Sequence, residues 1–173
     1  MTRVHADDES ALLCEANVIT RSAATGKIRI PNRVQSKGKK EERRRMTELT
    51  NQLTRVYRPE LESLAARLGV QGQIDNTGGG CMAVSAIVGQ APGTDHAMEL
   101  VVTTVDAGLA ETRAEIMHWY ACLYDVEEGG EALADGHDLA SFDAACDLAL
   151  QNLRDGIPPS DGVCACLLAP DRD

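Results

Sequence analysis

The chain has 173 residues, with 17 Lys and Arg against 27 Asp and Glu, which gives a formal charge of −10 at pH 7. This length fits one ordinary domain, and a hydrophobic content of 43% is too high for a wholly disordered chain. No run of about 18 apolar residues occurs, so the sequence predicts no membrane span. Residues 1–10 contain no apolar signal core, and we therefore expect a cytoplasmic rather than a secreted protein.

The charge is unevenly distributed along the chain. Residues 21–45 contain ten Lys and Arg against two Asp and Glu, a net charge of +8. Residues 46–173 contain six Arg and no Lys against 21 Asp and Glu, a net charge of −15. We therefore divide the chain into a basic, disordered leader or arm (1–45), a folded domain (46–156) and a C-terminal tail (157–173). Within the arm, only residues 27–30 resemble a strand.

The basic arm has three explanations. It could bind nucleic acid, although no aromatic residue precedes Tyr57 for a base to stack on. It could instead fold over the acidic domain. Alternatively, residues 40–42 (Lys-Glu-Glu) can be encoded by a bacterial ribosome-binding sequence three codons before Met46. Translation would then begin at Met46, and residues 1–45 would not belong to the native product.

The folded domain begins with a helical pattern. Apolar residues recur at Met46, Leu49, Leu53 and Val56 and continue to Leu68, so we predict a helix over 46–68 that Pro59 kinks or restarts. Short apolar or alternating segments then predict strands at 70–74, 81–88, 97–104, 117–125 and 131–134. A second helical pattern starts between 138 and 141 and ends before Gly156.

This order of elements predicts an α+β fold. An N-terminal helix, an antiparallel sheet of four or five strands and a C-terminal helix follow one another without βα alternation. We expect both helices to pack on one face of the sheet. The other face would then carry Glu99, Thr103, His118 and Tyr120.

The segment 77–81 (Thr-Gly-Gly-Gly-Cys) resembles a phosphate-binding loop, but a strand follows it where such a loop needs a helix. We interpret it as a glycine turn or bulge and predict no cofactor. Cys81 is a candidate nucleophile with His118 or His137 as base, if neighbouring strands bring them together. The alternative is that Cys81 is a small core residue.

Six cysteines occur without a secretion signal, so we expect reduced thiols. Cys164 and Cys166 form the one close pair and are candidate metal ligands, with His137, Cys146 or an acidic residue completing a zinc site. The alternative is a small apolar patch that packs the tail against the domain.

An acidic run follows the fourth predicted strand, and it does not match a calcium loop because Gly136 stands at the twelfth position. The run is either a solvated hairpin rim or part of a partner surface. In the second case, the partner-binding residues would be Tyr120, Tyr124, Asp125, Glu127 and Glu128, and a basic partner would be attracted by the −15 domain.

Residues 46 to about 156 resemble short uncharacterised proteins of actinobacterial phages and their hosts. The matching features are the start Met-Thr-Glu-Leu-Thr at 46–50, the segment 75–81 entering a strand, the hairpin with Trp119, Tyr124 and Gly129-Gly130, and the Ala-rich last helix. Such proteins often have Asp-Thr-Gly-Gly-Gly-Cys, so Asn76 is an insertion or shift here. The resemblance implies a small cytosolic accessory protein and assigns no catalytic residues.

The sequence therefore favours a small, acidic, noncatalytic accessory protein that binds another protein with a basic surface. That partner could itself bind nucleic acid. A small Cys/His enzyme or metal-binding protein, built on Cys81 with His118 or on Cys164 with Cys166, is the first alternative. A phage structural subunit is the second.

Overall fold

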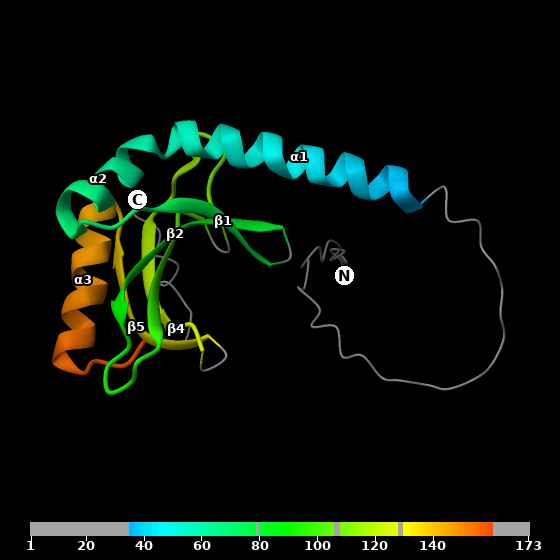
Figure 1. The fold of residues 1–173 in the computed structure, drawn as a ribbon. Helices are drawn as coiled ribbons and strands as arrows, with labels where there is room; N and C mark the ends of the chain where they lie inside the picture. The colour runs from blue at the N-terminus through cyan, green and yellow to red at the C-terminus, as the bar shows by residue number, and fades with distance from the viewer. Residues whose placement is uncertain (1–34, 79, 106–107, 128–129, 161–173) are drawn as a thin grey trace, which may run out of the picture.

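The computed structural model describes residues 35–160 except 79, 106–107 and 128–129. It contains three α-helices and one five-stranded antiparallel sheet, which confirms the predicted α+β class (Figure 1). The helices are α1 (Gln35–Val56), α2 (Arg58–Leu68) and α3 (Phe142–Asp155). The strands are β1 (Gln73–Gly78), β2 (Cys81–Gln90), β3 (Ala97–Thr103), β4 (Trp119–Asp125) and β5 (Glu131–Asp138), with a short 3₁₀ helix η1 (Arg113–Glu115) between β3 and β4.

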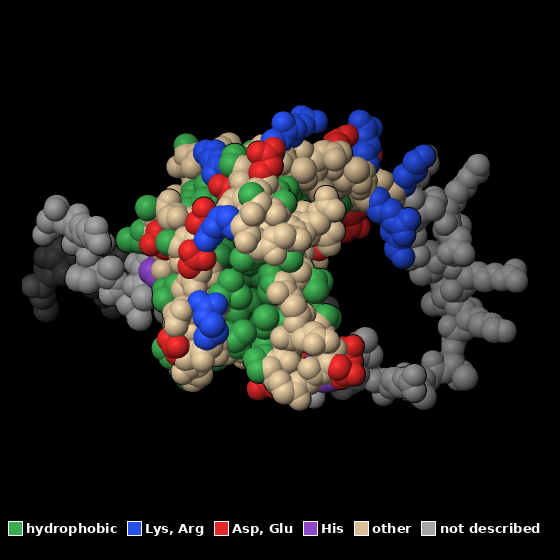
Figure 2. Space-filling model, turned by 60° about the vertical axis from the view of Figure 1, so that its left-hand side comes forward, with side chains coloured by type: hydrophobic (Ala, Val, Ile, Leu, Met, Phe, Trp, Pro, Cys, Tyr) green, Lys and Arg blue, Asp and Glu red, His purple; other side chains and the backbone are tan. Residues whose placement is uncertain are grey.

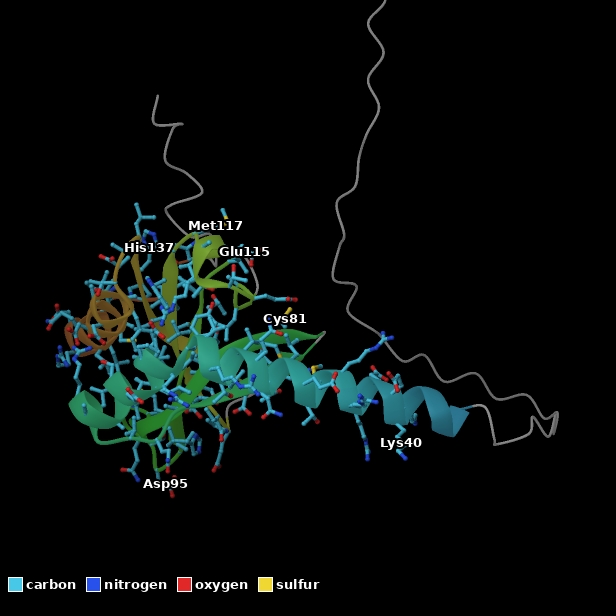
Figure 3. All side chains as sticks on the ribbon, turned by 90° about the horizontal axis from the view of Figure 1, so that it is seen from above. Lys40, Cys81, Asp95, Glu115, Met117 and His137 are labelled. Carbon is cyan, nitrogen blue, oxygen red and sulfur yellow. The ribbon has the colours of Figure 1, made fainter. Side chains whose placement is uncertain are left out.

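Helix α1 begins 11 residues before the predicted start at Met46, within the arm that we predicted to be disordered. Residues 35–45 are mostly Lys, Arg, Glu and Gln, which have high helix propensity. The ion pair between Arg44 Nε and Glu48 Oε1, at 2.9 Å, adds i,i+4 support. Met46 thus lies inside a continuous helix, whose first turns project past the sheet (Figure 1). Figure 3 labels Lys40 in these turns. The strand predicted at 27–30 lies outside the described residues.

The break between α1 and α2 falls at Tyr57, and Pro59 occupies the first turn of α2. Proline is accommodated there because the first amides of a helix have no intrahelical acceptor. Gly69 ends α2 in the left-handed conformation, with φ of 69°. The predicted restart at Pro59 is therefore confirmed.

The strands follow one another in the order β1-β2-β3-β4-β5, and each pairs antiparallel with the next. The glycine segment forms the β1–β2 connection, with a register shift between Asn76 and Gly78, so its interpretation as a turn with a bulge is confirmed. Side chains alternate between the two faces of the sheet. In β3, Met98, Leu100 and Val102 are buried, whereas the residues between them are half-buried.

The hydrophobic core lies between the sheet and the helices. Its larger buried members include Leu53 of α1, Leu64 of α2 and Tyr57 between them, and Val84, Leu100, Val102, Trp119 and Leu123 from the strands. Helix α3 packs on β4 and β5, and α1 contacts β1. We call the sheet side that carries this core the helix face, and the opposite side the open face.

Gly136 of β5 sets the distance between α3 and the sheet. A Cβ atom at this position would lie 2.3 Å from Ala149 N and 2.4 Å from Ala145 O. These are backbone atoms of α3, so they cannot move aside as a flexible side chain would. The small residues Ala145 and Ala149 complete the close contact and are fully buried.

A closed set of hydrogen bonds around the Tyr57 hydroxyl joins the α1–α2 junction to the segment that follows β3. The Tyr57 hydroxyl donates to Ala110 O at 2.9 Å and lies 3.0 Å from Thr104 Oγ1, which accepts from Ala110 N at 2.9 Å. The Tyr57 ring packs edge-on to Trp119, which packs edge-on to Phe142 of α3. Burial is the largest cause that raises the pKa of Tyr57, so the hydroxyl keeps its proton.

The segment between β3 and β4 is fastened to α2. Arg113 donates from both terminal nitrogens to Glu60, at 2.7 and 2.6 Å, and its guanidinium stacks over the Tyr57 ring. Glu60 is only 7% exposed, so this bidentate pair is largely shielded from solvent. A capping box between Thr112 and Glu115 shapes the turn that presents Arg113.

Figure 2 shows that α3 leaves part of the helix face uncovered. Hydrophobic side chains gather in a recess between α3 and the β1–β2 side of the sheet, below α2, and Lys and Arg side chains gather on α1. Partly buried Leu68, Val70, Val88, Leu150 and Leu153 belong to the elements around this recess and pack against the core. The helix layer therefore covers β4 and β5 more fully than β2.

Replacement of Gly136 by Ala is expected to destabilise the protein by about 3 kcal/mol, because α3 must move away from β5 to admit the methyl group. Gly93→Ala is the matched control: φ is 79° there and nothing lies within 4 Å of the added methyl, so it should cost about 1 kcal/mol of backbone strain. Urea denaturation of both variants measures the difference, and equal losses would contradict this account of the α3–β5 contact.

Tyr57→Phe is expected to lower the free energy of unfolding by about 1–3 kcal/mol, because it removes one hydroxyl from a buried ring of hydrogen bonds. Tyr124→Phe serves as the control, since the Tyr124 ring is half-buried and its hydroxyl interacts with the weakly polar Cys122 thiol. If Tyr57→Phe lowered the free energy of unfolding no more than Tyr124→Phe does, the hydrogen bonds around the Tyr57 hydroxyl would contribute little to stability.

Candidate functional site

The open face carries a groove with a cavity volume of about 520 Å³. Its lining comes from three strands (β1, β3 and β4) and the β4–β5 turn: Thr77, Glu99, Val101, Thr103, Tyr120, Cys122, Tyr124, Val126 and Gly130. This volume lies within the range of about 300–1,000 Å³ that is common for ligand sites. Glu99, Thr103 and Tyr120, three of the four residues predicted for the exposed sheet face, line it.

Strand register brings the groove residues together. Glu99 pairs with Tyr124, Val101 with Cys122, and Thr103 with Tyr120 across the β3–β4 ladder. Side chains opposite each other in an antiparallel pair lie about 4.5–5.5 Å apart at Cβ. Two tyrosines, a thiol and a valine therefore form one continuous floor, with the Glu99 carboxylate at one end.

Asp135 forms the polar edge of the groove on β5. It is 8% exposed, and its Oδ2 accepts from the Tyr120 hydroxyl at 2.9 Å and from Ser160 N at 3.1 Å. The Ser160 hydroxyl also donates to the same oxygen. These donors satisfy the buried carboxylate, which in turn fixes both the Tyr120 hydroxyl and the chain at Ser160.

Burial raises the pKa of Tyr120 and Tyr124 well above the ordinary value, and nearby Cys122 and Asp135 act in the same direction. Both hydroxyls are therefore protonated at any physiological pH and can serve as hydrogen-bond donors. Neither tyrosine can act as a base near neutral pH. The groove is thus suited to binding rather than to proton transfer by these residues.

Only part of the predicted partner surface lies together. Tyr120 and Tyr124 share the open face, but Asp125 alternates to the other face, is 3% exposed and contacts His96 Nδ1 at 3.0 Å. The Asp125 carboxylate also accepts from Glu127 N at 2.9 Å, so it shapes the hairpin turn instead of contributing to a solvated rim. Glu127 is exposed beside that turn. Glu128 lies outside the described residues.

The structure does not bring Cys81 and His118 onto neighbouring strands. Cys81 begins β2, whereas His118 precedes β4, and β3 lies between those two strands. His118 is buried and contacts the His137 ring, with centroids 6.2 Å apart. Figure 3 shows His137 far from Cys81, which lies beside α1. A Cys81 nucleophile with a histidine base therefore finds no support in this arrangement.

The candidate metal ligands are divided between described and undescribed residues. Cys164 and Cys166 lie outside the described residues, and Cys146 is buried in α3 on the helix face. His137 Nε2 is buried without a hydrogen-bond partner among the described residues. Within residues 35–160, apart from the gaps, no three His, Cys, Asp or Glu side chains are grouped so as to hold a metal ion.

Comparisons with protein-family models, curated proteins and solved structures return no match. None of the helices in the described part of the chain combines the length and apolar character needed to cross a membrane. The groove is therefore interpreted from its own chemistry.

Sequence reasoning missed Asp135 as a buried anchor and Ser160. Alternation within 97–104 does place Val101 on the same face as Glu99, as the structure has it. Asp135 was assigned to a solvated run because the fifth strand was predicted to end at 134, whereas β5 continues to Asp138. Ser160 had no signal, since its contact joins residues 25 positions apart.

Thiol reactivity tests the burial of the described cysteines. Burial raises the pKa of Cys122 and raises that of Cys146 to about 12, so thiolate is scarce at pH 8, whereas Cys81 is only half-buried. Iodoacetamide at pH 8 should label Cys81 at least tenfold faster than Cys122 and Cys146, as measured by peptide mass spectrometry. Denaturant should abolish the difference. Equal labelling of the three in the folded protein would contradict the described packing.

Proposed function

We propose that the protein is a noncatalytic accessory protein that binds a basic segment of another protein in the open-face groove. The observation that carries this proposal is the groove itself: two neutral tyrosines and a valine form its floor, and Glu99 faces into it. Tyrosine supplies apolar contact area and a hydrogen-bond donor from one side chain, which is why it is enriched at binding hot spots.

Electrostatics favour a basic partner. Asp135 and Glu99 lie in or beside the groove, and Glu127 and Glu131 are exposed at the neighbouring hairpin. The chain from Met46 onward has a net charge of −15, which steers a positively charged partner toward it and repels nucleic acid. An Arg or Lys side chain beside Glu99, with its aliphatic part on the tyrosines, would satisfy both features of the groove.

The sequence resemblance gives this proposal its setting, a phage or actinobacterial host cytoplasm. The alternatives built on Cys81 with His118, or on Cys164 with Cys166, have less support. The first pair is separated by β3, and the second lies outside the described residues. A subunit that assembles through the apolar recess of Figure 2 is the second candidate function, since that recess is also a surface of hydrophobic side chains.

In the first step of the test, the full chain is immobilised and incubated with actinobacterial lysate at about 50 mM and at about 500 mM salt. The captured protein is then purified, and its affinity for the chain is measured. Capture should fall at high salt, because exposed charges are screened. Tyr124→Ala should weaken binding about thirtyfold, equivalent to the roughly 2 kcal/mol of a hot spot, and Glu99→Gln about fivefold to tenfold.

Glu62→Gln is the matched control, because Glu62 is exposed on α2 and does not line the groove. It changes the net charge by the same amount as Glu99→Gln and should leave the affinity unchanged. Capture that is insensitive to Tyr124→Ala, or that weakens equally in the two Glu→Gln variants, would contradict binding in the groove.

A further inference from the structure

Residues 157–160 carry the chain from one side of the sheet to the other. Helix α3 ends at Asp155 on the helix face, whereas Ser160 binds the Asp135 carboxylate beside Tyr120, which lies on the open face. Asn152, in the last turn of α3, donates to Asp135 O at 2.7 Å and holds α3 and β5 together where the chain crosses. The described chain therefore ends at the edge of the groove.

The sequence that follows Ser160 suits that groove. Residues 163–169 (Val-Cys-Ala-Cys-Leu-Leu-Ala) form the apolar part of the tail and contain no charged residue. An extended chain of seven residues spans about 23 Å. Crossing from β5 to β3 requires only two strand spacings of about 4.8 Å each. The apolar segment begins three residues after Ser160, so it can reach the full width of the groove floor.

We propose that residues 161–173 dock in the open-face groove of their own chain, with the leucines at 167 and 168 on the floor made by Val101, Tyr120 and Tyr124. The Asp135–Ser160 contact starts this docking, because it places the first residue of the segment beside the groove. The segment is then an intramolecular occupant of the surface to which the partner would bind, and a partner must displace it. The segment carries no positive charge before Arg172, so Glu99 stays available to a basic partner.

Solution NMR of the full chain, labelled at the methyl groups, tests this proposal without any partner. Nuclear Overhauser effects are expected from the Leu167 and Leu168 methyls to the rings of Tyr120 and Tyr124 or to the Val101 methyls. Leu168→Asp should remove these effects, because it places a charge in the apolar part of the segment. The Val101 methyl resonances should then shift, because the segment no longer covers Val101. Arg172→Asp also adds negative charge to the segment but lies outside its apolar part, so it should preserve them.

Three results would overturn the proposal. One is contact of the leucine methyls with Val88, Leu150 or Leu153, which would place the segment at the helix-face recess. Another is an effect seen only between differently labelled molecules in a mixed sample, which would mean that the segment docks on a second copy. Leucine methyls that contact neither surface would also overturn it. Since no partner is present, failure here leaves the proposed function standing, and failed capture in lysate leaves the docking intact.

Discussion

The buried hydroxyl of Tyr57 is the interaction on which the rest of the structure depends. It lies where α1 gives way to α2, and its hydrogen bonds to Thr104 and Ala110 fix that junction over the end of β3. The Tyr57 ring contacts Trp119, which contacts Phe142 at the start of α3. One aromatic series thus connects all three helices through one end of the sheet. Loss of any polar member would leave buried groups without partners, which is costlier than the bond itself.

This concentration of packing on one face determines where binding can occur. The helices use the Trp119, Ala121 and Leu123 side of β4, so alternation leaves Tyr120, Cys122 and Tyr124 on the open face. The meander pairs β3 with β4, which supply the floor of the groove, and Thr77 of β1 with Val126 and Gly130 of the β4–β5 turn complete its lining. Asp135 then fixes Tyr120 from β5, so the site is held by the same strands that form the core.

The fold was predictable because each element has a local signal, whereas the site required contacts between distant elements. Helical spacing before Leu68 and alternation in 97–104 identify their elements directly, and Gly156 marks the end of α3. Burial of Asp135 was not predictable, because it lies in a polar segment and acquires its partner Ser160 from elsewhere in the chain. Alternation in β4 places Asp125 on the buried side with Leu123, but its partner His96 comes from outside that strand. The start of α1 was missed because a basic segment without apolar spacing gives no periodic signal, although its residues favour a helix.

Docking of residues 161–173 would cover the groove and would also make it selective among partner peptides. A tethered segment acts at an effective concentration of about a millimolar or more, so even a weak intrinsic affinity keeps it bound. The apparent affinity of a partner falls by the fraction of molecules with an open groove: occupancy of 99% weakens it about a hundredfold, or about 2.7 kcal/mol. An uncharged apolar peptide would compete for the same contacts as residues 161–173 and would have little binding free energy beyond theirs. A basic peptide would gain an additional interaction with Glu99, so under this proposal the charge of that carboxylate would select the peptides that displace residues 161–173.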